Sequence, residues 1–134
     1  LQVLDAAGTI TATVAPNGPR YDISFATAPG EGADMWGLSG SYNQGTSGRG
    51  RRVGFAHRTG GRWITYERAT GPNGNFPRND NDLSAAAWNP ANRKLYIASW
   101  GRGLIEWSGP DGPTRQFDPS NSPLQVVNLS TDPL

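Results

Sequence analysis

The only histidine, His57, is the first residue to consider for catalytic or metal chemistry. A zinc site draws several ligands from cysteine, histidine or carboxylate side chains, and this sequence has no cysteine and no second histidine. A serine nucleophile would be expected in a Gly-x-Ser-x-Gly turn. Ser39 lies in Gly37-Leu-Ser-Gly40, which does not match that motif. We therefore expect His57 to pack on a strand surface or between sheets, not to act as a ligand or a base.

Amide and acidic side chains gather at one point, the run Asn79-Asp-Asn-Asp82. Such a run could bind calcium, although it lacks the spacing and the distal glutamate of an EF-hand loop. Turn formation explains the same residue types, so calcium at Asn79–Asp82 stays an alternative. A glycosidase needs two converging carboxylates, and four others lie in or beside different turns: Glu31, Glu67, Glu106 and Asp111. We expect no catalytic residue, no cofactor and no metal, and a glycosidase or lyase fragment is the weakest alternative.

Aromatic and arginine side chains point instead to binding. Five tryptophans could stack on sugars or peptides, but in packed sheets most of them would fill the core. Trp100 is the best exception, because it precedes the Gly101-Arg-Gly103 link and could project beside Arg102, a pair that suits an anionic or sugar-bearing partner. The second candidate surface is the glycine-rich loop 40–51, whose simpler interpretation is a flexible insertion. Its candidate partner-binding residues, with the arginine that follows, are Tyr42, Arg49, Arg51 and Arg52.

Composition places these residues in a protein of many short strands. The apolar fraction is 35%, whereas 18 glycines and 11 prolines exceed ordinary usage. Disordered chains are poor in aromatic residues, and this one has five Trp, four Tyr and four Phe, so we interpret the glycines and prolines as turns. A net charge of +1 and scattered basic residues offer no face to nucleic acid. No apolar stretch approaches the roughly 18 residues of a membrane span, and no signal peptide is visible.

The strand-like segments recur along the chain. Residues 1–14 are predicted as a hairpin or half blade, residues 21–66 and 83–117 as two four-stranded blades, and residues 124–130 as the opening strand of another. A repeat of about 50 residues built from short strands is typical of β-propellers. The sequence therefore predicts an all-β fold, part of a β-propeller with about two and a half four-stranded antiparallel blades.

So few blades cannot close a ring, which needs about four to eight. We expect the remaining blades to come from a longer parent chain or from other copies, and Leu1, which is not an initiator methionine, favours the longer chain. Between neighbouring blades we expect apolar side chains of the second unit to fill the space. Those side chains are Leu95, Ile97, Leu104 and Trp107.

One stretch carries a family resemblance. Residues 81–124 contain Leu95-Tyr-Ile-Ala-Ser-Trp-Gly-Arg-Gly-Leu104 and continue through Phe117-Asp-Pro-Ser-Asn-Ser-Pro-Leu124. The first motif resembles the two-component-regulator propeller repeat, in which a strand like Leu-Trp-Ile-Gly-Thr is followed by Gly-Gly-Leu. The continuation resembles the PorZ-like propeller proteins of the type IX secretion system. Residues 21–66 match more loosely, because loop 40–51 replaces the short Trp-Gly-Arg-Gly link.

The resemblance implies a non-catalytic module outside the cytoplasm, in the periplasm or at the cell surface. Its expected role is recognition or scaffolding in type IX secretion, with a protein or surface glycan as partner. The alternative is the ligand-sensing propeller of a hybrid two-component histidine kinase. The absence of cysteine is compatible with an oxidising compartment but does not choose between locations.

Overall fold

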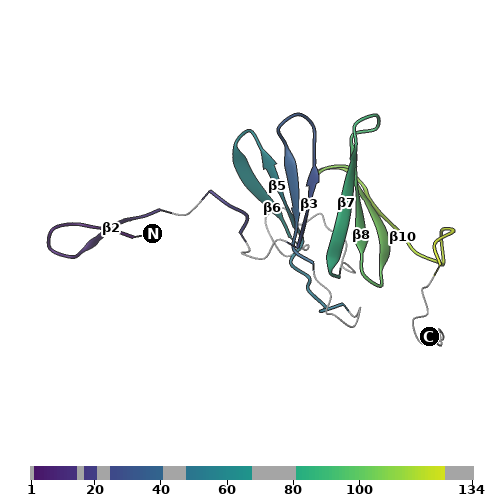
Figure 1. Cartoon of the computed structure of the whole chain (residues 1–134), viewed down its shortest axis with the longest axis horizontal. Helices are drawn as coiled ribbons and strands as arrows, with labels where there is room; N and C mark the ends of the chain where they lie inside the picture. The colour runs from purple at the N-terminus through teal and green to yellow at the C-terminus, as the bar shows by residue number, and fades with distance from the viewer. Residues whose placement is uncertain (1, 15–16, 21–24, 41–47, 68–80, 126–134) are drawn as a thin grey trace.

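The computed structural model describes residues 2–14, 17–20, 25–40, 48–67 and 81–125, and these form an all-β fold (Figure 1). The strands make three antiparallel sheets, one of two strands and two of four, consistent with blades of a partial propeller. None of the described residues forms a helix with the length and hydrophobicity to span a bilayer. The strands are β1 (Gln2–Leu4), β2 (Ile10–Thr13), β3 (Ala26–Pro29), β4 (Met35–Leu38), β5 (Phe55–Thr59), β6 (Arg62–Tyr66), β7 (Leu83–Asn89), β8 (Lys94–Ser99), β9 (Gly103–Trp107) and β10 (Thr114–Phe117).

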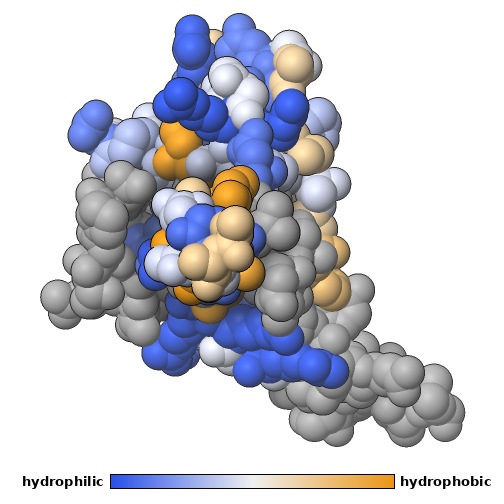
Figure 2. Space-filling view, turned by 90° about the vertical axis from the view of Figure 1, so that its left-hand side faces the viewer, coloured by the Kyte–Doolittle hydropathy of each residue, from blue (hydrophilic) through white to orange (hydrophobic). Residues whose placement is uncertain are grey.

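The two-stranded sheet is the N-terminal hairpin β1–β2, which projects away from the other two sheets (Figure 1). The Asp5 carboxylate shapes its turn by accepting hydrogen bonds from the backbone N–H groups of Ala7 and Thr9, both at 2.9 Å. Every residue of both strands is exposed, including Leu4 at 56% and Ile10 at 52%. Hydrophobic surface is accordingly visible from this side (Figure 2). A lone hairpin gains little stability in water, so this element lacks the packing that stabilises the larger sheets.

The two large sheets share one strand order. The first sheet runs β3-β4-β5-β6 and the second β7-β8-β9-β10, each strand pairing antiparallel with the next along the chain. The first strand described within the predicted blade 21–66 is Ala26–Pro29, and residues 21–24 fall outside the described residues. The predicted strand at 124–130 lies mostly outside the described residues.

Two glycines show that the sheets are structural repeats. Gly54 (φ 73°) and Gly103 (φ 85°) each stand just before or at the start of the third strand of their sheet. A Cβ on Gly54 would lie 1.9 Å from the Tyr66 carbonyl oxygen, and one on Gly103 would lie 2.0 Å from that of Phe117. Both positions therefore require glycine for the backbone angle and for space. Aligning them makes Phe55 equivalent to Leu104.

The strand registers extend this equivalence across both sheets. Leu38 pairs with Phe55 as Ala98 pairs with Leu104, and Trp36 pairs with His57 as Tyr96 pairs with Glu106. Trp36, Leu38, Phe55 and His57 lie on one face of the first sheet, and this face is largely buried against the second sheet. The equivalent face of the second sheet, with Tyr96, Ala98, Leu104 and Glu106, looks away from the first sheet. The sheets thus pack front to back, a heterologous contact that can continue to a further sheet. In a two-sheet sandwich, by contrast, both inner faces are covered.

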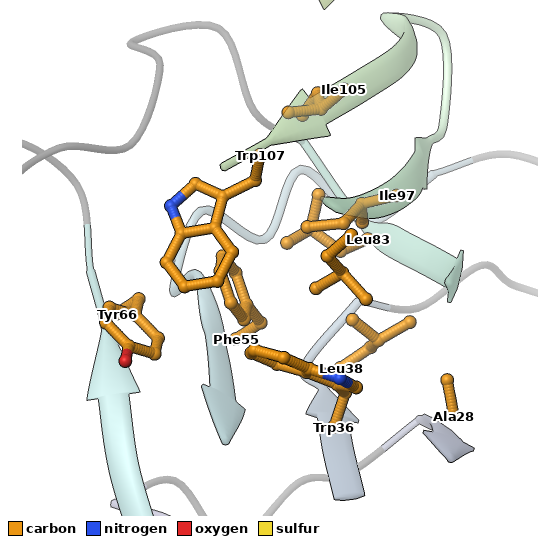
Figure 3. Close-up of a cluster of buried hydrophobic side chains, with 10 residues drawn as sticks. Ala28, Trp36, Leu38, Phe55, Tyr66, Leu83, Ile97, Ile105 and Trp107 are labelled. Atoms are coloured by element: carbon orange, nitrogen blue, oxygen red, sulfur yellow. The ribbon is translucent and has the colours of Figure 1, made fainter. Parts of the chain in front are cut away.

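Side chains from both sheets form one core, shown in Figure 3. Phe55, Leu38, Leu95, Ile97 and Ile105 have no exposed surface. The expectation for Leu95, Ile97 and Trp107 agrees with this core. Leu104 does not join this core: it is half-buried and lies on the opposite face, because residues alternate along β9 and Ile105 is the one that faces the core.

Candidate functional site

The end of the sheets opposite the hairpin turns, here called the loop end, is organised by the buried carboxylate of Asp82, which is 1% exposed. Its Oδ2 accepts a hydrogen bond from the Gly50 N–H at 2.6 Å, and its Oδ1 accepts one from the Arg51 N–H at 3.0 Å. The Asp82 backbone N–H donates to the Arg51 carbonyl at 2.8 Å, and its own carbonyl accepts from the Trp100 N–H at 3.2 Å. Asp82 therefore ties the β4–β5 connection to the β8–β9 turn.

These hydrogen bonds bring the loop 40–51 close to the turn that carries Trp100 and Arg102, the two candidate surfaces predicted from the sequence. A Cβ on Gly48 would lie 2.7 Å from Trp100 Cδ1 and 2.7 Å from Asp82 Oδ2, so the loop backbone packs directly on the indole. Trp100 is half-buried by this contact, and Arg102 on the same turn is exposed. The Arg102 carbonyl accepts a hydrogen bond from Gln116 Nε2 at 2.8 Å, which holds the turn against β10.

The loop arginines stand in three different environments. Arg49 and Arg52 are exposed, and Arg52 Nε donates to Asn81 Oδ1 at 2.7 Å. Arg51 is half-buried, and its Nη1 is buried without a hydrogen-bond partner. Tyr42 lies outside the described residues. The loop end thus offers exposed positive charge beside an indole ring, a combination that suits anionic partners.

Of the four residues proposed to bind calcium, Asn81 and Asp82 already use side-chain oxygens in hydrogen bonds within the protein. The Asp82 carboxylate is occupied by two backbone N–H groups, and Asn81 Oδ1 accepts from Arg52. Residues 79 and 80 lie outside the described residues. Within the described ranges, no three His, Cys, Asp or Glu side chains come close enough to hold a metal ion.

The opposite end, where the hairpin turns of both sheets meet, holds a cavity of about 390 Å³. It is called here the turn-end cavity. Three turns of the two sheets, β3–β4, β5–β6 and β7–β8, gather at the top of Figure 1. The cavity is lined by aromatic rings from the strands and by charged and polar residues from the turns. Its lining residues include Glu31, Asp34, Trp36, His57, Trp88, Arg93, Trp107 and Ser108.

His57 belongs to the wall of this cavity. Its ring stacks on Trp36 with centroids 3.6 Å apart and planes 9° apart, and its Nε2 lies 3.1 Å from Asp34 Oδ2. Burial lowers the pKa of His57 below its ordinary value, while the neighbouring Asp34 carboxylate acts in the opposite direction. The expectation that His57 packs on a strand agrees with this position, but the carboxylate beside it was not foreseen.

Three polar atoms around the turn-end cavity have no hydrogen-bond partner, namely Trp36 Nε1, Trp88 Nε1 and Ser108 Oγ. All three atoms are buried, and such unpaired groups are uncommon in folded proteins. Sequence reasoning assigned most tryptophans to the core and did not single out Ser108. The only sequence signal for this site was the recurrence of tryptophan or polar residues at the strand ends beside hairpin turns.

The outer face of the second sheet carries a separate polar cluster. Glu106 is only 7% exposed, and its carboxylate accepts hydrogen bonds from Lys94 Nζ at 2.7 Å and from the Tyr96 hydroxyl at 3.1 Å. The Lys94 hydrogen bond is the main cause that lowers the pKa of Glu106, and the Tyr96 bond acts in the same direction against burial. This cluster is satisfied internally and presents no unpaired group to a ligand.

The comparisons add no relative to this description: no family model, no curated protein and no solved structure matches the chain. The candidate sites therefore stand on geometry alone.

Proposed function

We propose that this chain is a propeller segment that acts as a non-catalytic recognition and scaffold module. We place it in a larger protein outside the cytoplasm, of the type IX secretion class that its repeat resembles. The loop end is the partner-binding surface in this proposal. The partner is an anionic protein or surface glycan.

The observation that carries this proposal is the set of hydrogen bonds by which Asp82 joins the β4–β5 connection to the β8–β9 turn. A connection of this length would ordinarily be free to move, and ordering it costs conformational entropy. Here a buried carboxylate, bonded to two backbone N–H groups, fixes residues 50 and 51 beside Trp100. Asp82 thus holds the backbone of residues 50 and 51 close to the β8–β9 turn that carries Trp100 and Arg102, and preorganised groups bind with a smaller entropic loss.

The scaffold part of the proposal is supported by the open face of the second sheet. Ala85, Ala87, Leu104 and Phe117 lie on it, at positions equivalent to Ala26, Ala28, Phe55 and Tyr66 of the first sheet. The first-sheet set packs against a following sheet, so the second-sheet set is suited to receive another sheet of the same kind. We assign that place to a further blade.

The recognition proposal is tested by binding of two anionic probes, a polyglutamate peptide and polygalacturonate, to the immobilised protein. We expect at least one probe to bind, with affinity falling as salt is raised, because exposed charges are screened. Removing the charge in Arg102→Ala and in Arg49→Ala is expected to weaken binding about threefold to tenfold each. Arg62→Ala is the matched control, since Arg62 is an exposed arginine at the turn end.

The proposal fails if neither probe binds at low salt. It also fails if Arg62→Ala weakens binding as much as Arg102→Ala, because attraction would then depend on overall charge and not on the loop end. A circular dichroism spectrum of each variant checks that the sheets remain folded.

A further inference from the structure

The turn-end cavity has the chemistry of a ligand site that is separate from the loop end. It lies between the two sheets, so each sheet supplies part of its wall. Trp36 and Trp88 face each other across the sheets with centroids 5.9 Å apart, and Trp107 meets Trp36 edge to face at 5.5 Å. A volume of about 390 Å³ is within the range of small-molecule pockets.

The unpaired donors say what kind of ligand would be favoured. An indole N–H can only donate, and a buried donor without an acceptor destabilises the fold. Trp88 and Ser108 are half-buried residues that line the cavity, while Trp88 Nε1 and Ser108 Oγ are buried in its wall, so these two donors reach a ligand only once their side chains rotate. A ligand that brings hydrogen-bond acceptors would satisfy groups that the protein itself leaves unpaired.

The charged groups narrow the choice. Asp34, held by His57, and Glu31 put two carboxylates at the cavity, and Arg93 reaches Glu31 at 3.8 Å across the two sheets. Two carboxylates disfavour an anionic ligand but can accept hydrogen bonds from hydroxyl groups. A quaternary ammonium ion would suit the aromatic walls, but it has no acceptor for the three unpaired donors.

We propose that the turn-end cavity binds the ring of a neutral sugar. A pyranose has an apolar C–H face that packs on an indole ring, and its hydroxyls both accept and donate hydrogen bonds. Trp88, the least buried of the three indoles, supplies the stacking surface. Trp88 Nε1 and Ser108 Oγ donate to ring or hydroxyl oxygens, and Asp34 accepts from a hydroxyl. This site is independent of the anionic partner proposed for the loop end.

The test uses the whole chain and a panel of neutral methyl pyranosides of glucose, galactose, mannose and N-acetylglucosamine. Binding is followed by tryptophan fluorescence and by saturation-transfer NMR. We expect saturable binding of at least one pyranoside. Trp88→Ala is expected to weaken it about tenfold or more, and Trp88→Phe and Ser108→Ala, which remove single donors, by a few-fold each.

The matched control is Trp63→Ala, which removes a half-buried indole from the outer face of the first sheet. It should leave sugar binding unchanged, as should Arg102→Ala at the loop end. If Trp88→Ala does not fold, Trp88→Phe and Ser108→Ala decide the question.

The proposal is overturned if none of the pyranosides binds saturably, or if Trp88→Phe and Ser108→Ala both bind as well as the unaltered chain. Equal or stronger binding of tetramethylammonium would also overturn it and would assign the cavity to a cation. Loss of sugar binding with intact anionic-probe binding, or the reverse, separates this proposal from the one for the loop end.

Discussion

The first sheet, β3–β6, and the second sheet, β7–β10, have the same strand order but differ in how their middle strands are joined. In the second sheet β8 ends at Ser99 and β9 begins at Gly103, so the link is a tight turn. In the first sheet β4 ends at Leu38 and β5 begins at Phe55, and the connection between them runs to the loop end. The same repeat has thus been used once with a minimal link and once with a long one. The long link depends on Asp82, from the second sheet, for its placement.

The sheets also differ in the fate of one equivalent face. Trp36 and His57 of the first sheet are covered by the second, whereas Tyr96 and Glu106 at the same positions look outward. The covered pair is an aromatic stack, and the outward pair is a hydrogen-bonded tyrosine and carboxylate. Equal backbone positions therefore carry different chemistry according to whether another sheet lies over them.

The largest expected effect tests whether the sheets are equivalent at all. Gly54→Ala and Gly103→Ala each place a Cβ about 2 Å from a carbonyl oxygen at a positive φ. We expect each to lower the free energy of unfolding by about 4 kcal/mol or more, enough to unfold a small β protein. Urea denaturation checks this. Gly61→Ala, also at positive φ but in open space, should cost only about 1 kcal/mol. Unequal losses at Gly54 and Gly103 would contradict the equivalence.

The next effect separates the covered face from the open face. Phe55→Ala removes a ring with no exposed surface and should lower the free energy of unfolding by about 3–5 kcal/mol. The equivalent Leu104→Ala removes a half-buried side chain and should cost about 1 kcal/mol, because water already reaches that face. Thermal melting of both variants measures the difference. Similar losses would mean that another sheet covers Leu104 in solution.

A smaller effect tests the tie between the sheets. Asp82→Ala leaves the Gly50 and Arg51 N–H groups without their acceptor and should cost about 1–3 kcal/mol. It should also weaken binding of the anionic probes at the loop end, because the backbone of residues 50 and 51 is no longer held close to the β8–β9 turn. The matched control is Asp111→Ala, at an exposed turn residue, which should change neither quantity. Loss of stability without loss of probe binding would separate the tie from recognition.

The smallest effect concerns the equivalent pair His57 and Glu106, which should affect stability in different pH ranges. The pKa of His57 is lowered in the fold, so the unfolded chain binds its proton more readily, and stability is lost as the pH falls below 6.5. The pKa of Glu106 is also lowered, so its contribution is lost only as the pH falls below 4.5. Melting temperatures are measured across pH for two variants. His57→Gln should lose the fall in stability that begins below pH 6.5, and Glu106→Gln should lose the fall that begins below pH 4.5.

Much of the fold could be predicted from the sequence because its signals are local. Hairpin turns at Thr59-Gly-Gly61 and Ser108–Gly112, and alternation along Lys94–Ser99, arise from residues that are neighbours in the chain. Leu104 and Trp107 were expected together between blades, but the period of two places them on opposite faces of β9, so only Trp107 joins the core between these two sheets.

The candidate sites were less predictable, since each joins residues distant in the chain. Trp100 and the loop arginines were proposed from their types, but their proximity depends on Asp82, which had been considered only as a calcium ligand or turn residue. The turn-end cavity was not foreseen, because no local pattern places Asp34 beside His57 or Trp88 opposite Trp36.

The sequence by itself determined the strands, the turns and the repeat, because glycine at positive φ, proline in turns and alternating side chains act over a few residues. Tertiary structure alone decided which face of each sheet is covered, which tryptophans line a cavity and where the long connection is tied. Those outcomes depend on front-to-back packing and on hydrogen bonds between residues such as Arg51 and Asp82, whose contact exists only after the two sheets have come together.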